Sequence, residues 1–120
     1  MGLPRSTTKA TAAQTARRFS VYVVELEPAV LEFRKFREAN PDCSRPRSCL
    51  YVGMTAHAPD VRFDQHKSGY KSGKYVKRYG LRLVPELYEH HNPLYYEDAC
   101  RVEIQLAEAL RNRGYAVWQN

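Results

Sequence analysis

Five residues of this 120-residue chain have types and spacings that could support chemistry. Tyr22 and Tyr51 lie in short apolar runs, Arg62 and His66 are four residues apart, and Glu103 lies in a long amphipathic stretch. A phenol accepts a proton near neutral pH only with cationic help, because its pKa is ordinarily about 10. Each residue also has a structural alternative, namely core packing for the tyrosines and a solvated surface for the other three.

Two apolar runs predict the strands that must hold the tyrosines. Residues 19–26 and 49–53 are rich in Val, Tyr and Leu and carry few charges, as buried strands do. A third strand is expected over 81–89, where Pro85 argues for an edge position. Residues 115–118 are expected to close the fold as a short strand or packed tail.

Helical patterns hold the remaining candidates. Residues 58–67 predict a helix with a proline and an aspartate at its start, which places Arg62 and His66 on one face. Apolar residues at steps of three and four over 96–112 predict a long helix, and Glu103 is adjacent to its buried stripe.

Residues 27–48 contain a predicted helix followed by a polar loop, inserted between two strands that would otherwise form a hairpin. A shorter helical piece is expected over 73–78. These elements predict an α+β fold, a small sandwich in which helices flank a three-stranded, mainly antiparallel sheet.

The order of the motifs resembles the GIY-YIG nuclease family over residues 20 to about 118. The resemblance rests on Ser20-Val21-Tyr22, on Tyr51-Val52-Gly53 followed by Met54-Thr55, on Arg62 with His66, and on Glu103 four residues after Ala99. The chain departs from the family in having Ser20 for the first glycine, Met54 where many members have a lysine, and the insertion at 27–48.

The resemblance implies a metal-dependent endonuclease that hydrolyses phosphodiester bonds in DNA. It implies that Tyr22 or Tyr51 activates water, that Arg62 and His66 hold the phosphate, and that Glu103 binds Mg²⁺ or Mn²⁺. Help for the base would come from His66, Arg62 or a lysine of the following segment. Glu97 and Glu108 are alternative carboxylates, and Asn120 is the one candidate for the asparagine that ends the fold in relatives.

Charge points to a polyanionic partner, with nucleic acid as the first candidate and an anionic membrane as the second. The net charge is +6 and the pI is near 9.4. Residues 62–82 hold seven cations and one acid, with Tyr70, Tyr75 and Tyr79 between them. The cations expected to bind nucleic acid are Lys67, Lys71, Lys74, Lys77, Arg78 and Arg82.

Residues 1–18 carry four cations and no acid and are expected to form a flexible basic arm before a single domain at 19–120. No apolar run is long enough to span a bilayer, so we expect a cytoplasmic protein that is not associated with a membrane. A partner protein that confers specificity is a further expectation.

The three cysteines, Cys43, Cys49 and Cys100, are expected to be free thiols, with Cys100 in the core. Structural zinc at Cys43 and Cys49 is the alternative, with His57 as the one nearby imidazole. Two other functions stay open, a non-cleaving nucleic-acid-binding module on the same scaffold and a structural protein that docks on a ribosome or membrane.

Overall fold

A computed structural model describes residues 16–120, so most of the predicted arm at 1–18 lies outside the described part of the chain. One four-stranded sheet with the strand order β3-β1-β2-β4 organises the fold. The strands are β1 (Ser20–Leu26), β2 (Cys49–Thr55), β3 (Gly80–Leu83) and β4 (Ala116–Gln119). The helices are α2 (Arg34–Glu38), α3 (Pro59–Ser68), α4 (Val76–Tyr79) and α5 (Tyr96–Asn112), with single 3-10 turns at η1 (Pro28–Glu32), η2 (Pro85–Leu87) and η3 (Glu89–His91).

The α+β class is confirmed, but the sheet has four strands and is mixed, whereas three mainly antiparallel strands were predicted. β1 pairs antiparallel with both β2 and β3, whereas β4 runs parallel to β2 and makes the sheet mixed. The expected strand at 81–89 ends at Leu83 because Pro85 starts a 3-10 turn. The parallel pairing of β4 depends on how α5 returns the chain to the sheet, which the pattern of four residues cannot show.

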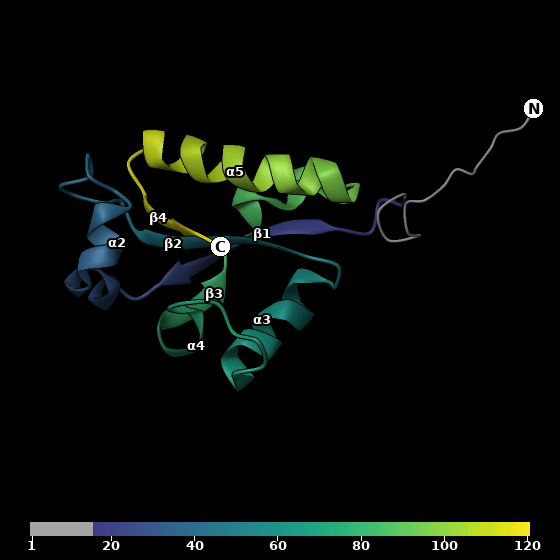
Figure 1. Cartoon of the computed structure of the whole chain (residues 1–120), viewed down its shortest axis with the longest axis horizontal. Helices are drawn as coiled ribbons and strands as arrows, with labels where there is room; N and C mark the ends of the chain where they lie inside the picture. Colours follow the sequence, from purple (N-terminus) through teal and green to yellow (C-terminus); the bar gives the residue numbers. More distant parts are fainter. Residues whose placement is uncertain (1–15) are drawn as a thin grey trace, which may run out of the picture.

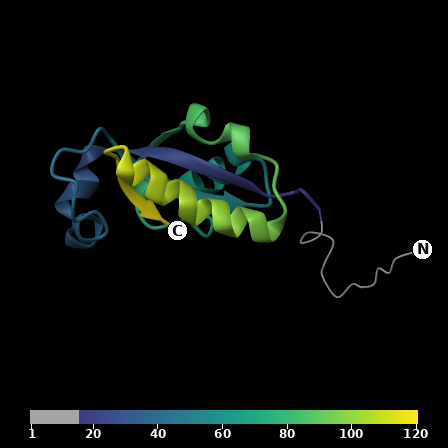
Figure 2. The ribbon, with the colours of Figure 1, turned by 90° about the horizontal axis from the view of Figure 1, so that it is seen from above.

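Helices cover both faces of the sheet. α5 lies along one face, and α3 and α4 lie on the other (Figure 1). Seen from above, α5 is a single straight rod that runs in nearly the same direction as β1 (Figure 2). α3 begins with Pro59 and ends at Gly69, whose φ of 91° is the left-handed conformation that favours glycine at a helix end.

The insertion at 27–48 is anchored to the fold by a buried asparagine. Asn40 donates from Nδ2 to the carbonyls of Phe36 and Val117, and its Oδ1 accepts from the Val117 amide and from Arg111 Nε. All four hydrogen-bonding positions of this side chain are therefore used. Phe36 is fully buried and packs on Trp118 of β4, with the ring centroids 6.3 Å apart. The insertion is thus an integral layer at one end of the sheet.

Residues 16–120 contain no helix with both the length and the apolar character needed to cross a membrane. Cys100, predicted to lie in the core, is half-buried on α5, and the three cysteines are free thiols.

Candidate active site

The strand register brings the two tyrosines to one face of the sheet. Tyr22 pairs with Gly53 and Tyr51 pairs with Val24, so the phenols are diagonal neighbours on adjacent strands. Their ring centroids are 6.1 Å apart, and both side chains are at most 1% exposed. His66 of α3 lies against both rings, at centroid distances of 6.0 Å and 5.5 Å. The sequence prediction that Tyr22, Tyr51 and His66 lie together agrees with this geometry.

Hydrogen bonds determine which nitrogen of His66 carries the proton. The amide of Gly73 donates to Nδ1 at 2.9 Å, so Nδ1 has no proton. Nε2 lies 2.7 Å from the Tyr22 hydroxyl oxygen. Burial, together with the charge of Arg62, lowers the pKa of His66 to about 4, so the ring is neutral at pH 7. The single proton is then on Nε2, which donates to Tyr22.

This protonation state gives His66 a specific place in the site. Both ring nitrogens are used within the fold, one as an acceptor from Gly73 and the other as a donor to Tyr22. The imidazole can therefore neither take a proton from water nor bind a phosphate directly. It can orient the Tyr22 phenol and stabilise negative charge on its oxygen.

The environments of the two phenols differ. Burial raises the pKa of Tyr22 to about 12, although the Arg62 charge lowers it in part. Burial and the adjacent Tyr22 raise the pKa of Tyr51 further, and its hydroxyl has no hydrogen-bond partner among the described residues. Gly73 leaves room for the Tyr51 hydroxyl, because a side-chain carbon added at that glycine would overlap it. Tyr22 is thus the phenol with the more favourable setting for losing its proton.

Arg62 links the site to the loop after α3. Its terminal nitrogens donate to Gln65 Oε1 and to the carbonyls of Tyr70 and Lys71, at 3.2, 3.2 and 2.7 Å. Three of the five guanidinium hydrogens are used in this way, and Nε and one hydrogen of Nη2 remain for a ligand. The Arg62 charge lowers the pKa values of both phenols, so it lies within electrostatic range of the tyrosines.

Glu103 approaches the site from the other face of the sheet. It lies on α5, is only 7% exposed, and its Oε1 accepts a hydrogen bond of 3.2 Å from Gln119 Nε2. Its second oxygen, Oε2, is buried with no partner in the described part of the chain. Burial raises the pKa of this carboxyl. A half-satisfied buried carboxylate is costly to the fold, which is typical of a residue that awaits a ligand.

Gly53 lies beneath the Tyr22 phenol, since an added side-chain carbon there would come 2.7 Å from the Tyr22 hydroxyl. β4 ends at Gln119, the register partner of Val52, so among residues 16–120 the edge of β2 from Gly53 onward has no neighbouring strand on that side. The charge of Glu103 raises the pKa of both phenols, so the carboxylate lies within electrostatic range of them. Gly53 is therefore required by the close approach of the phenol.

A divalent cation fits the donor set at Glu103. The orphan Oε2 supplies one hard oxygen ligand, and Mg²⁺ keeps several waters and needs few protein ligands. No group of three or more His, Cys, Asp or Glu side chains gathers anywhere in residues 16–120. The alternatives Glu97 and Glu108 are exposed on α5. Asn120 is exposed, whereas its neighbour Gln119 contacts Glu103.

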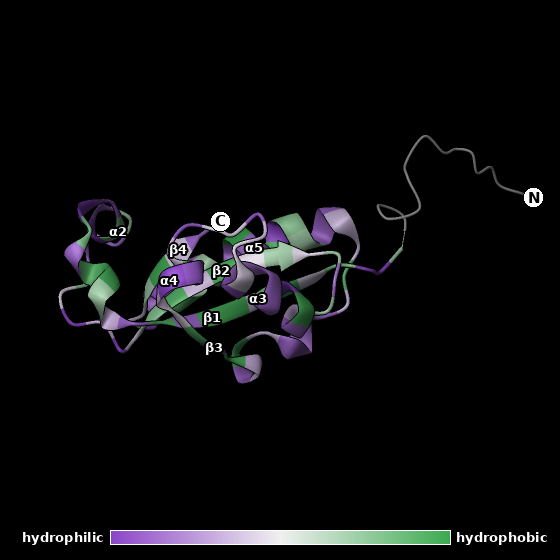
Figure 3. Ribbon diagram, turned by 90° about the horizontal axis from the view of Figure 1, so that it is seen from below, coloured by the Kyte–Doolittle hydropathy of each residue, from purple (hydrophilic) through white to green (hydrophobic). Residues whose placement is uncertain are grey.

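The predicted nucleic-acid-binding cations divide into two groups. Lys67 donates to the carbonyls of Lys77 and Gly80, and Arg82 pairs with Glu25 at 3.0 Å, so both have structural contacts. The other four, Lys71, Lys74, Lys77 and Arg78, are exposed. Figure 3 shows that residues of α3 and α4 are largely hydrophilic, whereas those of the strands beneath them are largely hydrophobic. The free cations thus lie on the face of the sheet that holds the tyrosines.

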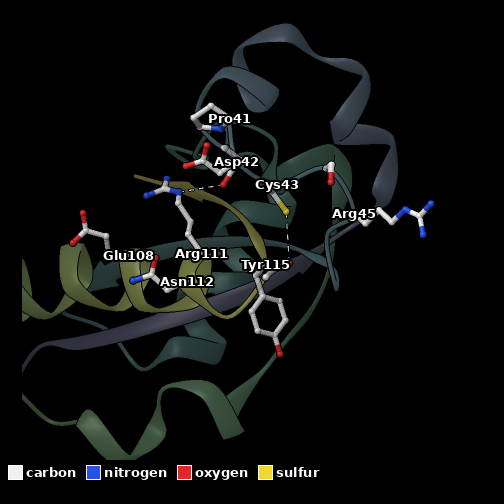
Figure 4. A pocket seen from close by; sticks show the side chains of 11 residues that line it. Pro41, Asp42, Cys43, Arg45, Glu108, Arg111, Asn112 and Tyr115 are labelled. Atoms are coloured by element: carbon white, nitrogen blue, oxygen red, sulfur yellow. Dashed lines mark hydrogen bonds between the residues drawn. The ribbon is translucent and has the colours of Figure 1, made fainter.

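A cavity of about 360 Å³ lies between the insertion and the C-terminal end of α5 (Figure 4), and neither Tyr22 nor Tyr51 lines it. Arg111 in its wall donates to Asn40 and to the Val117 carbonyl, and Cys43 donates to the Gly114 carbonyl at 3.6 Å. These side chains fasten the insertion to the helix end, so their polar groups serve the fold.

Sequence reasoning missed three functional positions. Gln119 makes the hydrogen bond that Glu103 has in the described chain, Gly73 makes the second hydrogen bond of His66, and Gly53 was singled out only as part of a motif. The signal for Gln119 was its place beside Asn120 in a terminal strand, where alternation decides which side chain faces α5. Comparisons of the chain with protein-family models, with curated proteins and with solved structures find no match. Function is therefore inferred from the residues of the site and their contacts.

Proposed function

We propose that this protein is a metal-dependent endonuclease that hydrolyses phosphodiester bonds in DNA, with a site of the GIY-YIG type. The observation that supports this best is the half-satisfied, buried Glu103 carboxylate, which lies within electrostatic range of the Tyr22 hydroxyl. The two groups come from the first strand and the last helix of the described chain. A core with no ligand to bind has no need for a buried carboxylate oxygen without a partner in the described chain, in range of a phenol that a histidine orients.

Tyr22 is the proposed general base. Its oxygen receives the Nε2–H of His66, so negative charge that develops on the phenol is stabilised by a hydrogen bond already in place. After Tyr22 has lost its own proton to solvent, water attacks the phosphorus, the water proton passes to the Tyr22 phenolate, and the bond from phosphorus to the leaving oxygen breaks. With a pKa of about 12 in the free protein, Tyr22 needs a nearby positive charge to act at neutral pH.

Arg62 and Glu103 supply the electrostatic part of the mechanism. The free donors of Arg62 are suited to an oxygen of the scissile phosphate, and its charge favours the Tyr22 phenolate. Glu103 would hold Mg²⁺ or Mn²⁺ through Oε2, with Gln119 fixing the carboxylate through Oε1. When bound, such an ion polarises the phosphate and stabilises the departing oxygen.

Cutting of a supercoiled plasmid tests this proposal. Purified protein should convert supercoiled DNA to nicked and linear forms with Mg²⁺ or Mn²⁺ and leave it intact with EDTA. Glu103→Gln is the matched control, because it keeps the size and the contact with Gln119 but loses the charge. Cutting that survives EDTA or the control variant would exclude the proposed mechanism.

A non-cleaving DNA-binding module is the second candidate. Met54 stands where many GIY-YIG members have a lysine, and burial raises the pKa of both phenols. Retarded DNA in a gel without cutting, in either metal, would favour this module over the enzyme.

A further inference from the structure

The insertion contributes an exposed aromatic ring to the face that carries the free cations. Phe33 lies between η1 and α2 and is 41% exposed, although a ring of this size is ordinarily buried. Its centroid lies 5.5 Å from that of Tyr75 and 5.7 Å from that of Tyr79. The interplanar angles are 47° and 63°, so neither tyrosine stacks parallel on it.

Two cations lie next to this group of rings. The Lys74 ammonium lies 5.6 Å from the Tyr75 ring centroid, and the Arg78 guanidinium carbon lies 5.7 Å from that of Tyr79. Both cations are exposed. We call Phe33, Tyr75, Tyr79, Lys74 and Arg78 the Phe33 platform. Rings next to free cations are the composition with which proteins bind single strands, by stacking on bases and pairing with phosphates.

The platform is close to the proposed site along the chain. Gly73 donates to His66 and contacts the Tyr51 hydroxyl, and Tyr75 follows two residues later. Two residues span at most about 7 Å, which equals the rise of about two nucleotides in a DNA strand. A strand held at the proposed site would therefore reach the platform within a few nucleotides.

We infer that the Phe33 platform binds an unpaired nucleotide next to the cleaved bond, so that the substrate is DNA with a single-stranded segment such as a flap or a splayed end. This inference rests on the proposed function for the position of the cut. In a duplex the base faces are covered by neighbouring bases, and Phe33 has no donor or acceptor to read a groove edge. An unpaired base offers a free face for the ring, and the cations offset its phosphate.

Binding without cutting tests the inference apart from catalysis. Fluorescence anisotropy in EDTA would compare an oligothymidylate of about 20 nucleotides with a duplex of the same length. Phe33→Ala should weaken binding to the single strand at least fivefold, about the lower limit for loss of one stacked base, and change duplex binding less than about twofold. Phe33→Tyr keeps a ring and should restore single-strand affinity to within about twofold.

Two controls separate stacking from other effects. Ile104→Ala removes an exposed apolar side chain on α5, across the sheet, and should change neither affinity. Trp118, the one tryptophan of the chain, lies 5.1 Å from Tyr75 between ring centroids, so unchanged tryptophan emission in Phe33→Ala shows that the packing beneath the platform is intact. The stacking loss should also persist between about 50 and 200 mM salt, whereas the loss caused by Lys74→Ala should shrink.

The inference is overturned if Phe33→Ala lowers the affinity for single strand and duplex equally, or lowers neither affinity. The endonuclease proposal still stands in that case if the protein cuts plasmid. Wild-type protein that binds neither DNA would overturn both proposals. If the Phe33 surface binds a protein partner instead, Phe33→Ala should leave both DNA affinities unchanged.

Discussion

The α3 side and the α5 side of the proposed site differ in how fully the folded chain satisfies them. On the α3 side, hydrogen bonds run without a gap from the Gly73 amide through His66 to Tyr22. On the α5 side, Gln119 binds one oxygen of Glu103 and the other oxygen has no partner in the described chain. The first side is preorganised by the protein alone, whereas the second leaves a position for a ligand to complete.

Because of this difference, burying the two sides costs different amounts of folding stability. A neutral imidazole with partners on both nitrogens can be buried at little expense, because each nitrogen exchanges water for a protein partner, and the unpaired Tyr51 hydroxyl on this side is uncharged. A buried carboxylate with a free oxygen costs stability, and burial accordingly raises its pKa. Loss of the α5 side should therefore remove activity while sparing the fold, and loss of the α3 side should affect both.

The largest effect is expected from Glu103→Gln. It removes the charge that would bind a cation but keeps the shape and the contact with Gln119, so cleavage should fall to background while DNA affinity stays nearly unchanged. Plasmid nicking and a gel shift on the same preparation measure the two properties. Glu108→Gln, on an exposed face of the same helix, is the matched control. Full activity of Glu103→Gln would move the carboxylate role to Glu97 or Glu108, or exclude the enzyme.

Next in size is the separation of the two phenols. Tyr22→Phe loses the hydroxyl that His66 orients and should slow cleavage by roughly 10² to 10⁴, the range for loss of a general base. Tyr51→Phe loses a hydroxyl that has no partner among residues 16–120, and it should slow cleavage clearly less. Single-turnover rates with saturating metal give the comparison. The reverse ranking would make Tyr51 the base, and two unaffected rates would exclude a tyrosine mechanism.

The fold was predictable where a pattern is long and local. The bounds expected for the helix at 96–112 agree with those of α5, because many turns repeat the same apolar stripe. β4 is four residues long, and its parallel pairing depends on contacts far away in the sequence. The third strand was expected to be too long because short 3-10 turns after Leu83 also place apolar residues at close spacing.

The site was predictable in residue types more than in contacts. Spacing along one helix was enough to place Arg62 and His66 together. The contacts themselves depend on strand register and on the path of the chain between elements. They include the hydrogen bond from His66 to Tyr22, the contact of Glu103 with Gln119 rather than with Asn120, and the bond from Lys67 to α4. None of these contacts is local in sequence, so no spacing rule could have given them.

A third prediction tests the stability of the α3 side against pH. The pKa of His66 is about 4 in the folded protein and about 6.5 when unfolded, so the unfolded state binds more protons between these values. The contribution of His66 should be complete above pH 6.5 and should fall by up to about 3 kcal/mol as the pH drops to 4. Denaturant unfolding of the wild type and His66→Gln at several pH values isolates it. His57→Gln, at an exposed histidine, should keep the wild-type dependence, and a parallel pH dependence in His66→Gln would contradict the neutral imidazole.

The smallest effect is expected on DNA affinity, from replacing exposed cations that lie outside the proposed catalytic residues. Three exposed lysines follow α3, namely Lys71, Lys74 and Lys77. They are not paired side chains of the kind that read base edges in a groove, so they should contact phosphates without reading sequence. Replacing all three by Ala should flatten the dependence of log affinity on log salt by up to about one unit per lost contact, equally on unrelated DNA sequences. Lys67→Ala is the matched control, because its ammonium donates to the Lys77 and Gly80 carbonyls, so it should lower the melting temperature and change the slope less. If the slope stays the same in the triple variant, the phosphates lie elsewhere, and the cations of the arm at residues 5–18 become the next to replace.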